Sequence, residues 1–339
     1  MNIEDIKPIQ IIGTQRSGSN LLRLMLNQMP SISAPHPPHI LSTFYPLLDK
    51  YKPLQKDSNF HLLIHDVCRL IETNPVKWNC NLDQELIYKT CKRRSLLEIF
   101  KTIYQIMAYH NQASFWCCKS MSNSNYFSQF KQERLSPYFI HLIRDGRDVA
   151  CSFRKILVGE KHPYHLAQKW KSNYLTAKRI ERLAGPSKFV TIKYESLISD
   201  PLSELNRIGQ LLQIDISNNV LNYFSSQESK KTAEAGYMWR NVQKPVMKEN
   251  FRNYKNEFND DEIKIFENVA GEELQENGYE LEFPSTKHTY SDSEVRTFDL
   301  VNEELKQSIR NKKYLRKDLD SRRLQYQLLD ELNLKLSTG

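Results

Sequence analysis

The sequence predicts an α/β domain built on a mostly parallel sheet with flanking helices, followed by a helical extension at the C-terminus. Short apolar runs typical of buried strands alternate along the chain with longer stretches of helical periodicity. Such alternation is typical of a parallel sheet covered by helices. A change to dense mixed charge near residue 285 indicates the extension. With 339 residues, the chain is long enough for a sizeable core.

Residues 8–12 form the first predicted strand, an apolar run that ends at Gly13. The segment 21–26 follows with the apolar face of a helix. The further predicted strands are 115–118, 138–143 and 188–192, and the main helical stretches between them are 98–110 and 166–183. Ligands of parallel sheets bind beyond the C-terminal ends of the strands. Gly13, Lys119 and Arg144 each lie at such an end, so we expect them to meet at a binding site.

The last part of the chain, 294–339, is predicted to be one long amphipathic helix, joined to a domain over 1–284 by a polar linker over 285–293. Apolar side chains recur in it every three or four residues, as in a weak coiled coil or in a helix packed on its own domain. Both alternatives stay open, and the first predicts a homo-oligomer formed through this helix. The stripe consists of Leu315, Leu319, Tyr326, Leu329 and Leu336.

The composition excludes several classes of protein. Apolar residues make up 40% and charged residues 26%, which favours a soluble globular chain over a disordered one. No apolar run approaches the ~18 residues of a membrane span, and no leader-like segment opens the chain, so we expect a cytoplasmic protein. The net charge of +8 favours an anionic partner. Because no nucleic-acid-binding signature is present, we expect a small anionic ligand and no nucleic acid.

The strongest local signal is the segment GTQRSGSN at 13–20, between a predicted strand and a predicted helix. Its glycines have the G-x4-G spacing of a P-loop, whose backbone N–H groups and helix N-terminus hold a phosphate. A nucleotide P-loop also needs Lys and then Ser or Thr after the second glycine. Ser19 and Asn20 stand there instead. With Arg16 as its cation, the loop suits a phosphate that needs no metal.

Three segments together resemble the sulfotransferases that use 3′-phosphoadenylyl sulfate (PAPS). GTQRSGSNLL resembles the family's 5′-phosphosulfate-binding loop. LIRDGRDVACSF, at 142–153, resembles its 3′-phosphate segment, in which an Arg ends a strand and a Ser follows eight residues later, as Arg144 and Ser152 do. Tyr194 opens YESL, which resembles the family's Y-E-D-L element near the nucleotide. The resemblance covers 8–282 and points to the bacterial, tyrosylprotein-type and carbohydrate-type branch.

The resemblance implies the P-loop-like sulfotransferase fold, PAPS as co-substrate and no metal. PAPS is charged at a 5′-phosphosulfate and at a 3′-phosphate, and one phosphate loop cannot hold both ends. An Arg that binds phosphate bidentately, beside a hydroxyl donor, suits the second end. The predicted PAPS-binding residues are Arg16, Ser17, Gly18, Ser19, Asn20, Arg144, Ser152, Tyr194 and Lys244.

The resemblance alone implies a role in the site for two lysines, Lys119 and Lys244. Lys119 ends a predicted strand where related enzymes have a Lys near the transferred sulfuryl group. The segment 241–255 resembles the family's nucleotide-covering loop, but it lacks the R-K-G triplet of the cytosolic branch. The cation that reaches the nucleotide from this loop is therefore left open between Lys244, Lys248 and Arg252.

Transfer by in-line displacement needs a base that takes the proton of the acceptor hydroxyl. Related enzymes with an Arg in the loop use a carboxylate just after the first helix, but no Asp or Glu occurs there between residues 5 and 49. His36 and His39 stand in that stretch, and imidazole titrates near neutral pH. His36 is slightly preferred. The predicted catalytic residues are His36, His39, Arg16 and Lys119.

The sequence thus predicts an enzyme that transfers the sulfuryl group of PAPS to a hydroxyl of a small molecule, carbohydrate or peptide. A P-loop-type nucleotide kinase is the first alternative, and the absent Lys and Mg²⁺-binding hydroxyl argue against it. A non-catalytic nucleotide-binding or scaffold protein is the second, and the missing acidic base keeps it open. The variable stretch 40–110 is expected to build the acceptor pocket.

Overall fold

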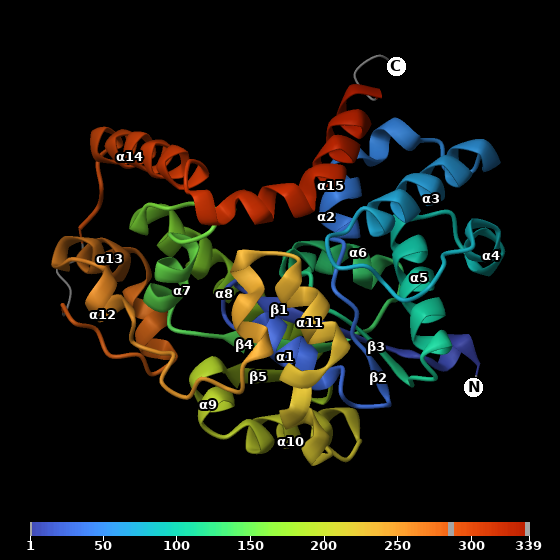
Figure 1. The fold of residues 1–339 in the computed structure, drawn as a ribbon, viewed down its shortest axis with the longest axis horizontal. Coiled ribbons are helices and arrows are strands. Elements are labelled where there is room, and N and C mark those ends of the chain that lie inside the picture. Colours follow the sequence, from blue (N-terminus) through green and yellow to red (C-terminus); the bar gives the residue numbers. More distant parts are fainter. Residues whose placement is uncertain (1, 284–287, 336–339) are drawn as a thin grey trace.

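The computed structural model describes residues 2–283 and 288–335 (Figure 1). Its strands form one five-stranded sheet in the order β2-β3-β1-β4-β5, and every neighbouring pair is parallel. The strands are β1 Lys7–Gly13, β2 Ile32–Ser33, β3 Phe115–Cys118, β4 Tyr138–Ile143 and β5 Phe189–Lys193. The predicted α/β class and parallel sheet are therefore confirmed. The two-residue β2 was not predicted, because it is too short to show a pattern.

Helices cover the sheet on both faces (Figure 1). The α-helices are α1 Ser19–Leu26, α2 Ile40–Phe44, α3 Asp57–Glu72, α4 Gln84–Thr90, α5 Leu96–His110, α6 Phe127–Gln132, α7 Gly146–Phe153, α8 Pro163–Ala184, α9 Tyr194–Ser199, α10 Pro201–Leu212, α11 Gln227–Glu234, α12 Tyr254–Glu257, α13 Asp260–Glu276, α14 Asp292–Arg310 and α15 Arg316–Lys335. The 3-10 helices are η1 Ile3–Asp5, η2 Tyr45–Tyr51, η3 Met121–Tyr126, η4 Pro186–Lys188, η5 Asn218–Ser225, η6 Tyr237–Gln243 and η7 Lys313–Leu315.

The hydrophobic core lies on the two faces of the sheet. Ile12 and Cys118 point to one face, where they pack with residues of α3, α5 and α8. Ile11 and Cys117 point to the other face, against α1 and α10. Because side chains alternate along a strand and both faces are buried, the strands are apolar throughout, which is why the sequence shows them as unbroken apolar runs.

The parallel arrangement brings three strand ends to one edge of the sheet. β1 lies between β3 and β4, so Gly13, Lys119 and Arg144 follow neighbouring strands at their C-terminal ends. This confirms the expectation that these positions meet. The loop 14–18, the start of α7 and the start of α9 lie at the same edge, which is the usual place for a ligand in such folds.

The C-terminal extension is helical, but the prediction of one long helix is wrong. α14 and α15 are separate helices that run in different directions (Figure 1). Asn311 caps the first helix, and Lys312 is extended, with φ −76° and ψ 122°. The break turns the chain so that Leu315 is buried. The predicted linker 285–293 lies partly outside the described residues, and α14 already begins at Asp292.

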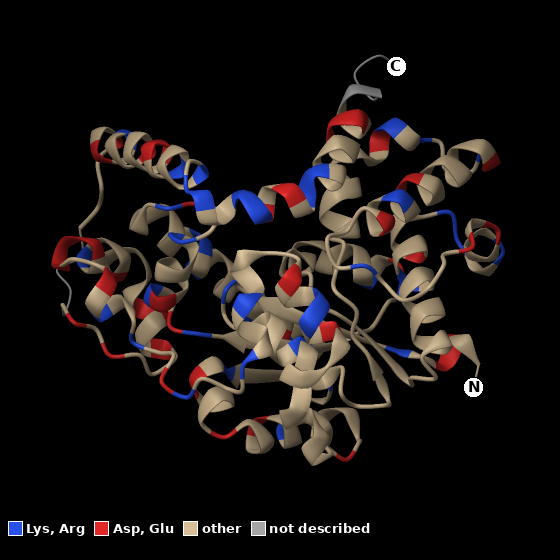
Figure 2. Cartoon of the chain, viewed as in Figure 1, with Lys and Arg blue, Asp and Glu red and all other residues tan. Residues whose placement is uncertain are grey.

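α15 packs on the domain, which is the alternative that the sequence left open. It crosses above α11 and reaches α3 (Figure 1). Leu328 and Leu332 belong to the main hydrophobic core. The Arg69 guanidinium donates to both carboxylate oxygens of Glu331, at 3.1 and 2.6 Å. Basic residues prevail along the first half of α15 (Figure 2).

The predicted apolar stripe, which spans η7 and α15, is partly buried and partly exposed. Leu315 is buried and Leu329 is half-buried against the core. Leu319 and Tyr326 are 39% and 38% exposed, and Leu336 lies outside the described residues. Self-association through this helix stays a prediction. Among the described residues of the stripe, Leu319 and Tyr326 are exposed and could contact a second copy.

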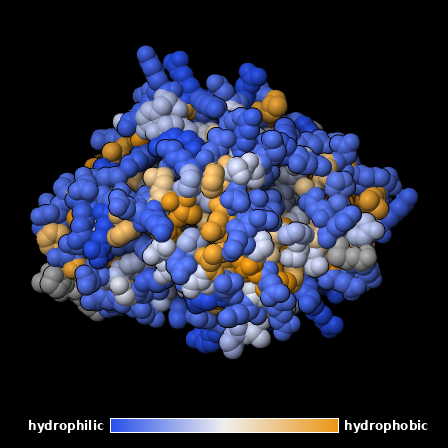
Figure 3. Space-filling model, turned by 60° about the horizontal axis from the view of Figure 1, so that its bottom comes forward, coloured by the Kyte–Doolittle hydropathy of each residue, from blue (hydrophilic) through white to orange (hydrophobic). Residues whose placement is uncertain are grey.

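The outer surface is mainly hydrophilic on the face shown in Figure 3, with apolar residues gathered near its centre. Within residues 2–283 and 288–335, no helix is both long and apolar enough to cross a bilayer. All six cysteines are free thiols.

Candidate active site

A cavity of about 510 Å³ opens at the edge of the sheet where the strand ends meet. This volume is in the range of pockets that bind small molecules and cofactors. The loop after β1, the ends of β3 and β4, the start of α9, η6 and α15 all contribute to its wall. The lining residues that carry the chemistry are Arg16, Gly18, Ser19, Asn20, His39, Lys119, Arg144, Ser152, Tyr194, Arg240 and Arg322.

Two left-handed residues shape the phosphate loop. Arg16 has φ 73° and Gly18 has φ 91°. A side chain at position 18 would also collide with Tyr194, since a Cβ there would lie 2.4 Å from the ring. The second glycine of the motif is therefore needed both for its conformation and for close contact with the ring. Ser19 then begins α1, whose free N–H groups lie at the cavity.

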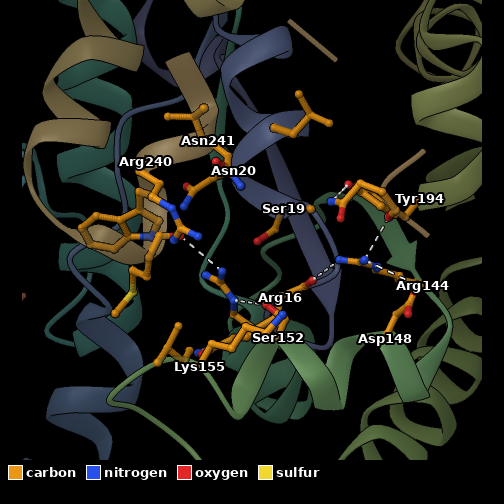
Figure 4. A pocket seen from close by; sticks show the side chains of 18 of the residues that line it. Arg16, Ser19, Asn20, Arg144, Asp148, Ser152, Lys155, Tyr194, Arg240 and Asn241 are labelled. Carbon is orange, nitrogen blue, oxygen red and sulfur yellow. Dashed lines mark hydrogen bonds and ion pairs between the residues drawn. The ribbon is translucent and has the colours of Figure 1, made fainter. Parts of the chain in front are cut away.

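Arg16 lies across the cavity from α1, toward α7 (Figure 4). Its Nε donates to Ser152 Oγ at 3.0 Å, and its Nη2 donates to the Met238 carbonyl at 3.2 Å. Burial lowers the pKa of Arg16 to about 10, and the guanidinium groups of Arg144 and Arg240 add to this effect. Several cations held close together in a buried place indicate a site for a polyanion.

Arg144 is held by two carbonyl groups and by a buried ion pair with Asp148. It donates to the carbonyls of Arg16 and Asn250 at 3.4 and 3.0 Å. Its guanidinium lies 4.4 Å from the centre of the Tyr194 ring (Figure 4). The Asp148 carboxylate is 3.5 Å away, and the buried Nε has no hydrogen-bond partner in the described part of the chain. An incoming phosphate would satisfy this group.

Asp148 is a residue of the site that the sequence analysis missed. Its carboxylate accepts hydrogen bonds from the backbone N–H groups of Arg252 and Tyr254, at 2.8 and 3.1 Å. Burial raises its pKa, while Arg144 opposes that shift. Asp148 therefore anchors the loop 250–254 beside Arg144. Its place four residues after Arg144 on a predicted helix was the signal that was available.

Lys119 is a nearly buried amine at the end of β3, with 9% of its surface exposed. It has no hydrogen bond or ion pair with any residue that the structure describes. Burial lowers its pKa to about 7, with further contributions from the Arg23 and Arg16 guanidinium groups. A lysine that is poorly solvated and surrounded by cations binds an incoming anion strongly.

The two candidate histidines lie in different surroundings. His39 lines the cavity, and its Nδ1 is 3.1 Å from Ser120 Oγ. His36 is absent from the lining: its ring meets Trp239 edge-on, with centroids 4.8 Å apart, and its Nδ1 is 3.4 Å from Asn74 Nδ2. The slight preference for His36 is therefore corrected in favour of His39, because only His39 reaches the cavity.

Burial keeps both imidazoles neutral. It lowers the pKa of His39 to about 3, with Lys119 and Arg322 adding to the shift. It also lowers the pKa of His36 well below the usual value, with the same Lys119 among the causes. His39 is therefore an unprotonated imidazole throughout the neutral pH range.

Two other predicted binding residues lie outside the cavity wall. Ser17 is buried, and its Oγ has no partner among the described residues. Lys244 is exposed, and its carbonyl accepts from the Tyr223 hydroxyl. Arg240, which lies within η6 four residues earlier, lines the cavity. The structure therefore does not bring Lys244 to the cavity wall, and its role in binding PAPS stays a prediction.

Arg23 is a second residue that the sequence analysis missed. It is fully buried, and it donates to Glu228, to Thr232 and to the Ala34 carbonyl at 2.7, 2.9 and 2.9 Å. Its Nε is 3.4 Å from Asn20 Oδ1. Arg23 thus joins the phosphate-loop helix α1 to α11. An Arg inside the apolar run LLRLML was the available signal.

The comparisons with known proteins agree with this geometry. The model of the sulfotransferase family matches residues 8–218, more than half of the chain. The chain belongs to the sulfotransferase family. A comparison with curated protein sequences gave no match.

Two solved structures share the fold of this sulfotransferase. The sulfotransferase domain from the Synechococcus PCC 7002 olefin synthase is 20% identical with a TM-score of 0.52, and the match covers 78% of this chain and 94% of that domain. The sulfotransferase domain from the curacin biosynthetic pathway is 17% identical with a TM-score of 0.53, and that match covers 81% and 98%. The predicted sulfotransferase fold is thus confirmed.

Proposed function

We propose that this sulfotransferase takes PAPS as its donor and transfers the sulfuryl group to an acceptor hydroxyl by in-line displacement. The observation that carries the proposal is that cations from three neighbouring strand ends line one cavity. Arg16 follows β1, Lys119 follows β3 and Arg144 follows β4. A donor with two separate charged ends matches this set better than a single phosphate does.

The donor would lie across the strand ends. Arg144 and Ser152 would hold the 3′-phosphate, beside the Tyr194 ring. The N–H groups of the loop and of α1, together with the Ser19 hydroxyl, would hold the 5′-phosphate. Arg16, which now bonds to Ser152, lies between the two charged ends and can serve either.

The chemical step requires a base on the acceptor side and a cation at the sulfuryl group. The acceptor oxygen forms a bond to sulfur while the bond from sulfur to the phosphate oxygen breaks, and the electron pair leaves with 3′-phosphoadenosine 5′-phosphate (PAP). His39 would take the acceptor proton at Nε2, if its Nδ1–H donates to Ser120. Lys119 would stabilise the negative charge that develops on the sulfuryl and bridging oxygens.

The donor would also tune these two groups. Burial lowers the pKa of His39, and the charges of Lys119 and Arg322 lower it further. A bound phosphosulfate places negative charge beside them, which raises the pKa of both His39 and Lys119. Binding of the donor therefore makes the His39 imidazole a stronger base.

Calorimetry with PAP and with adenosine 5′-phosphate tests the proposal. Each charge-assisted contact to the 3′-phosphate is worth about 1.5–3 kcal/mol, so we expect PAP to bind at least ~10-fold more tightly. Equal affinities would contradict the assignment of Arg144 and Ser152. Tighter binding of ATP with Mg²⁺ than of PAP would favour the kinase alternative. Transfer of labelled sulfate from PAPS to hydroxyl compounds is the matching activity assay.

A further inference from the structure

α15 contributes directly to the wall of the cavity, although it lies far along the chain from the phosphate loop and from Arg144. The Asp318 side chain accepts a hydrogen bond from the backbone N–H of Tyr237, at the start of η6. Asp318 is 1% exposed, and a Cβ at Gly236 would lie 2.3 Å from its Oδ1. This close contact, with no room for a side chain at position 236, holds the helix firmly against η6.

One turn further along α15, Arg322 lines the cavity. Its guanidinium lies 5.0 Å from the Trp239 ring centre, and its Nη2 is 3.9 Å from Met238 Sδ. Its Nε is buried without any hydrogen-bond partner among residues 2–283 and 288–335. No carboxylate of the described residues forms an ion pair with it. Arg322 is thus a half-buried guanidinium at the cavity wall, with Nε unpartnered and Nη2 in contact with only the weak acceptor Met238 Sδ. Such a group indicates an anionic ligand.

Arg322 belongs to the acceptor end of the cavity. Trp239, on which it stacks, also contacts His36. The charge of Arg322 lowers the pKa of His39 and of Lys119, so it acts on the proposed base and on the sulfuryl-binding lysine. Arg144 is held at the other end by Asn250 and Tyr194. The charges of PAPS already have their partners in Arg16, Lys119 and Arg144, which leaves Arg322 for the acceptor.

We propose that Arg322 binds an oxyanion of the acceptor, so that the natural acceptor is a hydroxyl compound that also carries a carboxylate or a similar group. This inference rests on the proposed function. A guanidinium offers two parallel N–H donors that match a carboxylate. The cation–π contact with the Trp239 ring helps to position the guanidinium. Arg322 would thereby select acceptors and place their hydroxyl near His39.

Pairs of acids and methyl esters test the inference on the full-length protein. Suitable probes are 4-hydroxybenzoate, 4-hydroxyphenylacetate and 10-hydroxydecanoate, each beside its methyl ester. For at least one pair we expect the wild-type kcat/KM with PAPS to favour the acid by ~10-fold or more, the size of a charge-assisted hydrogen bond. Calorimetry on PAP-loaded protein should show the same preference in binding, independently of turnover.

Substitution of Arg322 should remove this preference. We expect Arg322→Met to lower the ratio of kcat/KM for the acid to kcat/KM for the ester by ~10-fold. Any change that acts through the pKa of His39 or Lys119 affects acid and ester alike and cancels in this ratio. Arg322→Lys should keep part of the preference for the acid, because lysine retains the positive charge. Arg323→Met, an exposed neighbour outside the cavity wall, is the matched control and should behave as wild type. Thermal unfolding of each variant shows whether the fold is intact.

The outcomes separate this inference from the proposed function. No preference for the acid in any pair, or an equal loss for acid and ester in Arg322→Met, overturns the role of Arg322 at the acceptor. A raised KM for PAPS with unchanged acid preference would assign Arg322 to the sulfuryl group instead, and also overturns it. A failure of the wild type to bind PAP overturns the proposed function itself. If Arg322→Met does not fold, the same comparison is made with Arg322→Lys and Arg322→Gln.

Discussion

The two ends of the cavity are built in different ways. At the phosphate end, Arg16, Arg144 and Ser152 each stand in a short motif directly after a strand of the central sheet. At the acceptor end, His39 comes from a loop before α2, and Arg322 comes from α15, nearly three hundred residues later. The first end depends on local segments and a common sheet edge. The second depends on how distant helices pack around that edge.

This difference indicates which parts of the fold determine the specificity for the donor and which determine the specificity for the acceptor. The groups proposed to bind the donor are brought together by the geometry of the parallel sheet alone. The groups proposed to bind the acceptor have positions that depend on η6 and on the packing of α15. Substitutions at the phosphate end should therefore change nucleotide affinity, and those at the acceptor end should change turnover or the choice of acceptor.

The largest expected effect lies at the acceptor end. His39→Ala should lower kcat by ~10²–10⁴-fold, the usual size of general base catalysis, with PAP affinity unchanged by calorimetry. His36→Ala is the comparison: it should lower the melting temperature, because His36 is buried, and leave kcat within ~3-fold of wild type. If His36→Ala shows the large loss of kcat instead, His36 is the base and the assignment to His39 is wrong.

Lys119→Ala should lower kcat by ~10²–10³-fold, as expected for the loss of one group that stabilises transition-state charge. Because the pKa of Lys119 in the free protein is about 7, kcat/KM for PAPS should fall as the pH rises through about 7, where the amine loses its proton. The fall in kcat itself should occur at higher pH than the fall in kcat/KM, because bound PAPS raises the pKa of Lys119. In Lys119→Arg, which stays charged, the fall near pH 7 should disappear. If kcat/KM of Lys119→Arg still falls near pH 7, a group other than Lys119 causes the fall.

A smaller effect is expected at the phosphate end. Arg144→Ala should weaken PAP binding by ~10–100-fold, since it removes a charge-assisted contact, and should leave the affinity for adenosine 5′-phosphate nearly unchanged. Calorimetry with both nucleotides measures the difference. An equal loss for both would mean that Arg144 supports the fold of the site and does not contact the 3′-phosphate.

The smallest effect separates two neighbouring cations, Arg240 and Lys244. Arg240 lines the cavity but is exposed, so Arg240→Ala should weaken PAP binding by only ~2–5-fold. Lys244→Ala should change it by less than ~2-fold, because that side chain faces solvent. The reverse order in a titration with PAP would favour the choice made from the sequence.

Much of the fold was predictable because the strands are buried on both faces. β3 and β4 have the predicted bounds, and β1 and β5 differ by one or two residues. The break at Asn311 between α14 and α15 was not predictable from spacing, since polar residues continue the helical pattern through it. It follows from the burial of Leu315 and from the docking of Asp318 on η6.

By itself, the sequence determined the sheet, the phosphate loop and the pair Arg144 and Ser152, because each depends on residues close together in the chain and on a shared strand edge. Only the tertiary structure showed that His39 and Arg240 line the cavity whereas His36 and Lys244 do not, and only it brought Arg322 into the cavity. The physical reason is that the direction of a side chain on a loop or a surface helix depends on what packs against that element. Such contacts join distant segments, and no local pattern records them.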